Sequence, residues 1–490
     1  MPMVKRGWLG IGGLWLGLAC SGWAQTSTPP PELPREIEAA MARAKLPQDA
    51  ISILVLDAQG APGKTVPRLS HRAHQSLNPA SVMKLVTTYA ALDLLGPAYT
   101  WTTSVYVDGP VQSGILKGNL YIKGQGDPKL VMERLWLMLR RVQALGIRHI
   151  DGNILLDRSG FTLAETDPGS FDGEPLRPYN AAPDALLINF KSIVLSFSPD
   201  RSRGLAQVSA EPPLAGVQIP STVPLAGAEC ADYRAALKAD FSDAARIRLN
   251  GSYAASCGER TWPVAYVDPK SYGARAVEGM WKELGGKLTG QVRDGQVPSH
   301  LRPAFEFASP ALSEVVRDIN KYSNNVMAQQ LLLTLGWRAP ASPVASLAPS
   351  ATVEAALGVL QRWWKERLPD TPLPMIENGS GLSRTERIQP QALGQLLQTA
   401  YQSPVMPEFL ASLPIVGIDG TLRRSKAKSA LGAAHLKTGS LRDVAAIAGY
   451  VLGNSGRRYV LVAIANHASP GTLSAVRPLF DTLIEWTQAD

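Results

Sequence analysis

The sequence predicts an α/β fold spread over more than one domain. Three observations support this prediction. A β-rich run at Ala50–Asp57 precedes a strongly helical segment, and two β-rich runs near the C-terminus, Val444–Leu452 and Arg458–Asn466, flank a Gly-Asn-Ser-Gly turn. From about Trp101 to His300, short β-like runs alternate with Gly, Asp and Pro. A chain of 490 residues is too long for one ordinary core, so two or three domains are expected.

The N-terminus is organised like a secretory signal peptide. Lys5 and Arg6 form a basic start, Trp8–Ala19 is apolar, and Gly22-Trp23-Ala24 offers small residues for cleavage. We therefore predict that residues 1–24 export the chain to the periplasm. An uncleaved membrane anchor is the alternative, which the short and Gly-rich apolar stretch disfavours.

The helix after the first strand is the best-defined element near the N-terminus. Asn78 can cap it, Pro79 suits its first position, and Gly96-Pro97 ends it. Apolar side chains recur along it at helical spacing, so one face is expected to be buried: Val82, Leu85, Val86, Tyr89 and Leu92. The other helices are expected at Glu36–Lys45, Val131–Leu145, Ala311–Leu335, Thr352–Arg367, Pro390–Tyr401 and Leu473–Thr487.

We interpret the middle region as a large, mostly β insertion with two lobes, and it contains runs such as Thr103–Val107 and Gly118–Lys123. Cys230 and Cys257, which remain after signal cleavage, both lie in it. An even number of cysteines in an exported chain favours a disulfide between them. Two buried free thiols are the alternative.

Composition and charge narrow the functional classes. With 45% hydrophobic and 18% charged residues, the chain is globular and not disordered. A net charge of +8 suits contact with the anionic cell envelope, but no nucleic-acid motif accompanies it. His71 and His74 are the closest histidine pair, and no Cys or carboxylate cluster joins them at ligand spacing, so neither a metal nor another cofactor is expected.

Three short motifs follow one another in a fixed order, and together they describe one catalytic site. They are Ser81-Val82-Met83-Lys84, Ser323-Asn324-Asn325 and Lys437-Thr438-Gly439. Ser81 and Lys84 share one helical face, so the lysine can take the serine proton if its amine is uncharged. Because an ordinary lysine pKa is near 10.4, burial or a neighbouring cation must lower it. Lys437 can be that cation.

The other motif residues supply the remaining parts of a serine acyl-transfer site. The Ser323 hydroxyl can pass a proton to a leaving amine, and the Asn325 amide can hold a substrate peptide group and steady the lysine. Lys437 and Thr438 can bind a terminal carboxylate. Gly439 permits close backbone approach, and the N–H groups of Ser81 and Ser440 can form an oxyanion hole. A polar helix junction and a strand-edge turn are the non-catalytic alternatives for the second and third motifs.

Short motifs also occur by chance, and two further matches illustrate this. Ser425-Lys426-Ala427-Lys428 repeats the Ser-x-x-Lys spacing, but it lies in a basic loop without an apolar helical face and follows the middle motif. We interpret it as a solvated loop. Ser76-Leu77-Asn78 matches Ser-x-Asn but precedes the proposed nucleophile, so helix capping explains it better.

The ordered trio is the signature of penicillin-binding proteins and class A β-lactamases. The chain further resembles the class C low-molecular-mass penicillin-binding proteins, the D-alanyl-D-alanine carboxypeptidase/endopeptidase family. The resemblance extends over nearly the whole mature chain, at the segments Gly118–Pro128, Ser309–Glu314, Gly379–Arg384 and Gly417–Leu422.

The resemblance implies a penicillin-binding transpeptidase-like (β-lactamase-like) domain with an antiparallel sheet flanked by helices. This domain would comprise residues 25–98 and 301–490, and residues 99–300 would form two mostly β inserted domains. It implies a serine DD-peptidase that acts on peptidoglycan stem peptides and D-Ala-linked cross-bridges and is acylated by β-lactams. It also places Asp157, Phe161 and Arg384 at the diamino-acid side chain of the stem peptide.

Two departures from the family pattern accompany the resemblance. Asn378 stands where the family usually has Asp before Gly-Ser-Gly-Leu-Ser, and Asn324 occupies the centre of the middle motif. No carboxylate motif of the class A deacylation type is recognisable, so a bound β-lactam is expected to be hydrolysed slowly. A β-lactamase or esterase with the same site, and a non-catalytic wall-binding β-lactam sensor, are the alternative functions. The sequence leaves open the oligomeric state and the balance of carboxypeptidase and endopeptidase activity.

Overall fold

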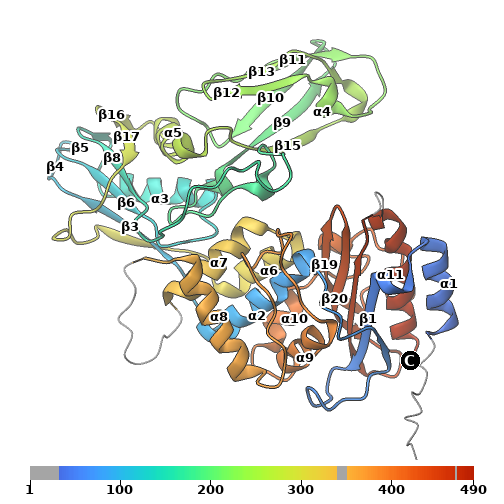
Figure 1. Ribbon diagram of the computed structural model, residues 1–490. Coiled ribbons are helices and arrows are strands. Elements are labelled where there is room, and N and C mark those ends of the chain that lie inside the picture. The colour runs from blue at the N-terminus through green and yellow to red at the C-terminus, as the bar shows by residue number, and fades with distance from the viewer. Residues whose placement is uncertain (1–32, 339–349, 469–471) are drawn as a thin grey trace, which may run out of the picture.

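The computed structural model describes residues 33–338, 350–468 and 472–490 (Figure 1). The predicted signal peptide, residues 1–24, lies outside these ranges, so export stays a prediction. In the described ranges, no helix is both long and apolar enough to cross a membrane. The chain forms two bodies (Figure 1). The core body comes from both ends of the sequence, and the inserted body consists of residues 102–308.

A five-stranded antiparallel sheet forms the centre of the core body. Its strands, in spatial order, are β19 (Ala434–Leu441), β20 (Val444–Leu452), β21 (Arg458–Asn466), β1 (Ile51–Asp57) and β2 (Leu69–His71). The predicted strands at 444–452 and 458–466 are confirmed as β20 and β21, which pair through the predicted turn. β1 pairs with β21, so the two ends of the chain join in one sheet.

Helices cover both faces of this sheet. α1 (Arg35–Ala44) and α11 (Thr472–Gln488) pack on one face. The other face carries α2 (Lys84–Leu95), α6 (Leu312–Tyr322), α7 (Asn325–Arg338), α8 (Val353–Arg367), α9 (Pro390–Tyr401) and α10 (Met406–Ser412). Because side chains alternate along a strand, Ile53 and Val55 enter the first layer, whereas Leu54 and Leu56 enter the second.

Helix α2 is more enclosed than its sequence pattern indicates. The prediction of one buried face is met by Val82, Leu85, Val86, Tyr89 and Leu92, which are all buried. The polar positions between them are buried as well, because every residue from 84 to 92 is shielded from solvent. A lysine at the start of such a helix is therefore removed from water.

The inserted body carries two β-rich lobes and three helices. The first lobe holds α3 (Met132–Ala144), α5 (Pro269–Glu283) and the strands β3 (Thr102–Val107), β4 (Val111–Gln112), β5 (Ile115–Leu116), β6 (Leu120–Lys123), β7 (His149–Ile150), β8 (Ile154–Asp157), β16 (Lys287–Leu288), β17 (Val292–Asp294) and β18 (Phe305–Ala308). The second lobe holds α4 (Tyr233–Ala236) and the strands β9 (Ser192–Asp200), β10 (Leu205–Glu211), β11 (Thr222–Ala226), β12 (Ala239–Asp243), β13 (Arg246–Leu249), β14 (Tyr253–Ala254) and β15 (Arg260–Ala265).

The predicted fold class is confirmed: an antiparallel sheet flanked by helices carries two mostly β insertions. β3 and β18 pair antiparallel, with Phe305 opposite Val105, so the chain leaves and returns to the core body side by side. The domain boundaries near residues 99 and 300 stay a prediction.

A disulfide joins Cys230 to Cys257 in the second lobe, with their Cα atoms 4.8 Å apart. Cys257 is buried against the core of the inserted body, whereas Cys230 is exposed. The bond closes a loop between residues that are 27 positions apart.

Removing this disulfide is expected to destabilise the inserted body. For a loop of this length, the chain-entropy argument gives a loss of about 3 to 4 kcal/mol in the free energy of unfolding. Thermal unfolding of a Cys230→Ser, Cys257→Ser double variant should show a lowered transition. The native protein treated with a reductant should show the same shift. Unchanged transitions in both samples would contradict this account.

Candidate active site

The predicted helical region Ala311–Leu335 consists of two helices that meet at the middle motif, as its polar residues indicate. Ser323 ends α6 in a left-handed conformation, with φ at 59°, and α7 begins at Asn325. A single left-handed residue ends a helix because the next N–H can no longer continue the helical pattern. The break brings the Ser323 hydroxyl and the Asn325 amide together at a helix junction.

Ser81 lies in a 3-10 turn, Ala80–Met83, that leads directly into α2. Side chains three residues apart nearly eclipse one another in a 3-10 turn, so Lys84 is placed over Ser81. Asn78 holds the start of the turn: its Oδ1 accepts from the Ala80 N–H at 2.9 Å, and its Nδ2 donates to the Ser383 carbonyl at 2.9 Å. The predicted cap position differs: Pro79 is the cap residue of the turn and Asn78 lies one residue before it.

Lys84 is fully buried, as is Lys437 of the third motif. Its Nζ lies 2.9 Å from Ser81 Oγ, 2.6 Å from Asn325 Oδ1 and 2.5 Å from the carbonyl oxygen of Ser380. Burial lowers the pKa of Lys84 well below its usual value, and the charge of Lys437 lowers it further, while Glu386 opposes both. A neutral amine can donate to Asn325 and Ser380 and keep its lone pair for the Ser81 hydroxyl.

Lys437 of the third motif contacts Ser323 of the second motif. Lys437 Nζ donates to Ser323 Oγ at 2.8 Å and to the Thr438 carbonyl at 2.7 Å. Burial lowers the pKa of Lys437 to about 7. The Thr438 hydroxyl donates to Thr421 Oγ1 at 2.7 Å, so two hydroxyls stand together beside β19.

Gly439 lets strand β19 approach the nucleophile. A Cβ at this position would lie 2.4 Å from the Pro79 carbonyl oxygen and 3.2 Å from the Ser81 nitrogen. Only glycine fits at these distances. Ser440 follows on β19, which is an edge strand of the sheet. Its backbone therefore lies beside the turn that carries Ser81.

Two backbone carbonyls from outside the three motifs also contact the site, those of Tyr179 and Ser380. Asn325 Nδ2 donates to the Tyr179 carbonyl of the inserted body at 3.3 Å. The loop that contains Ser380 packs on the nucleophile turn, because a Cβ at Gly381 would lie 1.9 Å from the Ala80 carbonyl oxygen. Sequence reasoning missed Ser380 and Tyr179, since both act through backbone carbonyls. The two glycines around Ser380 were the available signal for a close approach.

The family resemblance assigns three residues to the side chain of the stem peptide, and the structure places them in two regions. Arg384 follows the Ser380 loop, forms an ion pair with Asp443 at 3.2 Å and stacks over Phe171 at 4.4 Å. The other two, Asp157 and Phe161, belong to the inserted body.

Asp157 and Phe161 are occupied within the inserted body and against the end of α7. The buried Asp157 carboxylate accepts from the N–H groups of Ser159 and Val297 at 2.9 Å each. Phe161 packs edge-on against Trp337 at 6.1 Å. Trp337 lies about 18 Å along the helix axis from Asn325. A contact of these two side chains with the diamino-acid side chain of the stem peptide, away from Ser81, stays a prediction.

The second Ser-x-x-Lys match forms no catalytic pair. Ser425 Oγ donates to Asp481 of α11 at 2.6 Å, and the segment lies in a loop. In the described part of the chain, no group of three His, Cys, Asp or Glu side chains could hold a metal ion. His71 is bound to the Gln48 carbonyl at 2.8 Å.

Comparison with known families gives a match over nearly the whole chain. A family model described as "D-Ala-D-Ala carboxypeptidase 3 (S13) family" matches residues 33–485. A D-alanyl-D-alanine carboxypeptidase of an Actinomadura species is 28% identical over 478 residues, which cover 93% of this chain and 85% of that protein. The D-alanyl-D-alanine carboxypeptidase DacB of Haemophilus influenzae is 24% identical and covers 81% of this chain and 82% of its own.

Comparison with solved structures agrees on the fold. The crystal structure of penicillin binding protein 4 from Haemophilus influenzae superposes with a TM-score of 0.70 at 21% identity. The match covers 92% of this chain and 98% of that chain, so the core body and the inserted body both have counterparts in it.

Proposed function

Because the chain belongs to the D-Ala-D-Ala carboxypeptidase 3 (S13) family, we propose that Ser81 is the nucleophile through which it acts as a serine DD-peptidase. The protein is a low-molecular-mass penicillin-binding protein and a serine-type D-Ala-D-Ala carboxypeptidase. The observation that carries the assignment of Ser81 is its 2.9 Å contact with the buried Lys84 amine.

Acylation begins with transfer of the Ser81 proton to Lys84. Ser81 Oγ then attacks the carbonyl carbon of the penultimate D-Ala, and the N–H groups of Ser81 and Ser440 stabilise the negative charge that develops on the carbonyl oxygen. The C–N bond breaks when the leaving amine receives a proton, which passes from Lys84 through the Ser323 hydroxyl. Asn325, bonded to Lys84 at 2.6 Å, keeps the amine in place.

The terminal carboxylate of the substrate is bound beside β19. The buried positive charge of Lys437 attracts it, and the hydroxyls of Thr438 and Thr421 can donate to it. An extended stem peptide can also pair with the edge of β19 from Thr438 onward, beyond the part that bonds residues 414–416, as peptides do with exposed sheet edges. Arg384 at the rim remains a proposed contact for the stem-peptide side chain.

Deacylation reuses the same base. A water takes the place of the departed amine, Lys84 accepts its proton, and the acyl–Ser81 ester is hydrolysed. A β-lactam acylates Ser81 in the same way, but its leaving nitrogen stays attached to the adduct and hinders the approach of water. The adduct is therefore expected to be long-lived.

D-Ala-linked cross-bridges present the same bond, with a leaving amine that belongs to a neighbouring stem peptide. We propose that the site cleaves this bond as well. We also propose that the protein works in the periplasm, on the basis of the signal-like residues 1–24. Peptidoglycan stem peptides are its proposed partners and β-lactams its proposed inhibitors.

The test of the function is digestion of defined muropeptides by the purified protein. Release of D-Ala from a pentapeptide stem, and of monomers from a cross-linked dimer, is expected. Rapid turnover of nitrocefin without peptide cleavage would instead indicate a β-lactamase or esterase. Binding of intact muropeptides without cleavage would indicate a sensor.

The pH dependence of substrate binding tests the role of Lys437. A lysine whose pKa is lowered to about 7 is charged below this pH and loses its charge as the pH rises through it. The KM for a peptide with a free terminal carboxylate should therefore rise between about pH 6 and about pH 9. The same peptide with a terminal carboxamide serves as the control, and its KM should stay high and flat. Parallel KM profiles for the two peptides would refute this role.

A further inference from the structure

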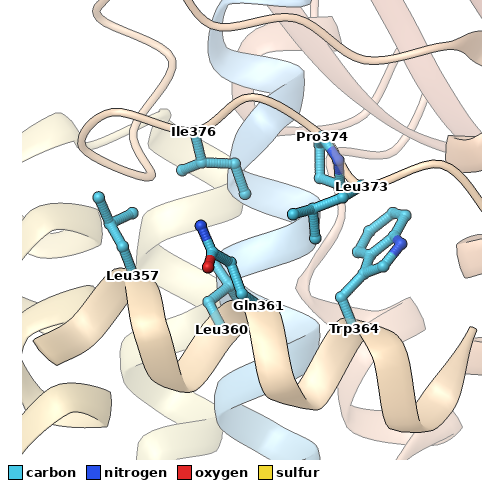
Figure 2. A pocket seen from close by; sticks show the side chains of 7 residues that line it. All are labelled: Leu357, Leu360, Gln361, Trp364, Leu373, Pro374 and Ile376. Carbon is cyan, nitrogen blue, oxygen red and sulfur yellow. The ribbon is translucent and has the colours of Figure 1, made fainter. Parts of the chain in front are cut away.

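The segment 375–388 forms a closed loop between α8 and α9. Its neck is held by two backbone hydrogen bonds between Met375 and Arg387, at 2.9 and 3.0 Å, and Ile388 bonds to Leu77 next to it. Just outside the neck the chain runs over an apolar pocket on α8, whose lining in Figure 2 is Leu357, Leu360, Gln361, Trp364, Leu373, Pro374 and Ile376. The loop is thus anchored on one side by apolar packing.

Glu386 lies in this neck and organises the interior of the loop. Its side chain is fully buried. Its Oε1 accepts from three successive backbone N–H groups, those of Glu377 and Asn378 at 3.0 Å each and of Gly379 at 3.1 Å. Its Oε2 is buried and has no hydrogen-bond partner among the described residues. No motif and no catalytic step described above uses this carboxylate.

The three N–H groups lead directly to the carbonyl that contacts the catalytic lysine. Ser380 follows Gly379, and its carbonyl oxygen accepts from Lys84 Nζ at 2.5 Å. The neighbouring Gly379 carbonyl accepts from the Thr87 hydroxyl of α2 at 2.7 Å. Asn378 Oδ1 accepts from both the N–H and the hydroxyl of Ser380. The direction of the Ser380 carbonyl therefore depends on how Glu386 folds residues 377–379.

Glu386 also acts on Lys84 through its charge. Two charged groups face the Lys84 amine, Lys437 from β19 and Glu386 from the loop neck. Burial is the largest influence on Glu386 and raises the pKa of its carboxyl above the usual value, while the three N–H groups and Lys84 act in the opposite direction. The exposed Glu377 of the same loop instead accepts from the hydroxyls of Ser383 and Thr385.

We propose that Glu386 is the positioning residue of the catalytic lysine: it aims the Ser380 carbonyl at Lys84 and supplies the negative charge that balances Lys437 across the amine. This inference rests on the proposed function, because Lys84 must be the base for its position to matter. Glu386 contacts neither substrate nor reacting atoms, so it acts only through Lys84.

Two substitutions separate its two effects. Glu386→Gln keeps an oxygen for the three N–H groups but removes the charge. The pKa of Lys84 should then fall, so the acid limb of the acylation rate against pH should move to lower pH. Glu386→Asp keeps the charge but is one methylene too short to hold the loop, and the acylation rate should fall by about 100-fold because the amine is misplaced. The measured quantity is the second-order rate of acylation by a labelled penicillin.

The matched control is Glu377→Gln, which removes a charge from the exposed side of the same loop. Its acid limb should coincide with that of the unmodified protein. The proposal is overturned if Glu386→Gln leaves the acid limb in place, or if Glu386→Asp acylates at the unmodified rate. Failure of the unmodified protein to react with penicillin would defeat the proposed function instead, and the two failures are therefore distinguishable.

Discussion

Ser81→Ala is expected to abolish both peptide cleavage and covalent labelling by penicillin. The loss in kcat should be at least about 10⁴-fold, because removal of a nucleophile leaves only binding and oxyanion stabilisation. Alanine removes a single hydroxyl at a partly buried turn, and the contacts of Asn78 and Gly381 with that turn do not use Ser81 Oγ. The fold should therefore survive, and noncovalent binding of a stem peptide should persist.

The second Ser-x-x-Lys copy provides the matched control for this variant. Ser425→Ala removes a hydroxyl that donates to Asp481 of α11 and not to a group of the three motifs. It should keep full activity and full labelling. A Ser81→Ala protein that still forms a penicillin adduct, or a Ser425→Ala protein that loses it, would contradict the assignment.

Lys84→Met is expected to slow acylation by about 10³-fold or more, because the general base is lost while its volume is kept. Methionine has a similar volume and fits the enclosed position at the start of α2. In the native protein, three polar contacts of the Lys84 amine offset the free-energy cost of its burial. The substitution leaves Asn325 Oδ1 and the Ser380 carbonyl without this donor, so a loss of about 1 to 3 kcal/mol in the free energy of unfolding is expected. Single-turnover acylation and a thermal melt measure the two effects.

The control for this variant is Lys428→Met in the basic loop, which should acylate normally. Loss of Lys84 should also remove the acid limb of the pH profile that its deprotonation produces. Acylation by Lys84→Met within about 10-fold of the unmodified rate would show that another group takes the Ser81 proton.

Most helices and strands of the core body could be predicted from local sequence patterns. The helix at 390–401 and the strands at 444–452 and 458–466 match their predicted bounds, because Pro390 and the Gly453–Gly456 turn mark the ends of regular patterns. The three motifs were predictable as a set because each places a reactive side chain at a spacing that its chemistry needs.

The backbone carbonyls that contact the site were not predictable. The left-handed conformation of Ser323, which ends α6, was not predictable either, because serine rarely adopts it. The carbonyls of Ser380 and Tyr179 have no residue-type signature, and they reach Lys84 and Asn325 from distant segments. The role of Glu386 depends on three N–H groups that only the folded loop brings together.

The roles of individual side chains that only the family resemblance implies stay predictions. The Asp157 carboxylate accepts from the backbone of Ser159 and Val297. Phe161 packs edge-on against Trp337 of α7. Strand alternation and loop closure decide which way such side chains point, and a single matched residue does not reveal either.

Localising a penicillin adduct tests the central claim most directly, namely that Ser81 with an uncharged Lys84 is the acylated centre. The folded protein is incubated with a labelled penicillin, its intact mass is measured, and the adduct is located by peptide mapping. The account predicts one added penicillin on the peptide that contains Ser81. An unmodified mass in a folded sample, or an adduct on any other residue, would contradict it.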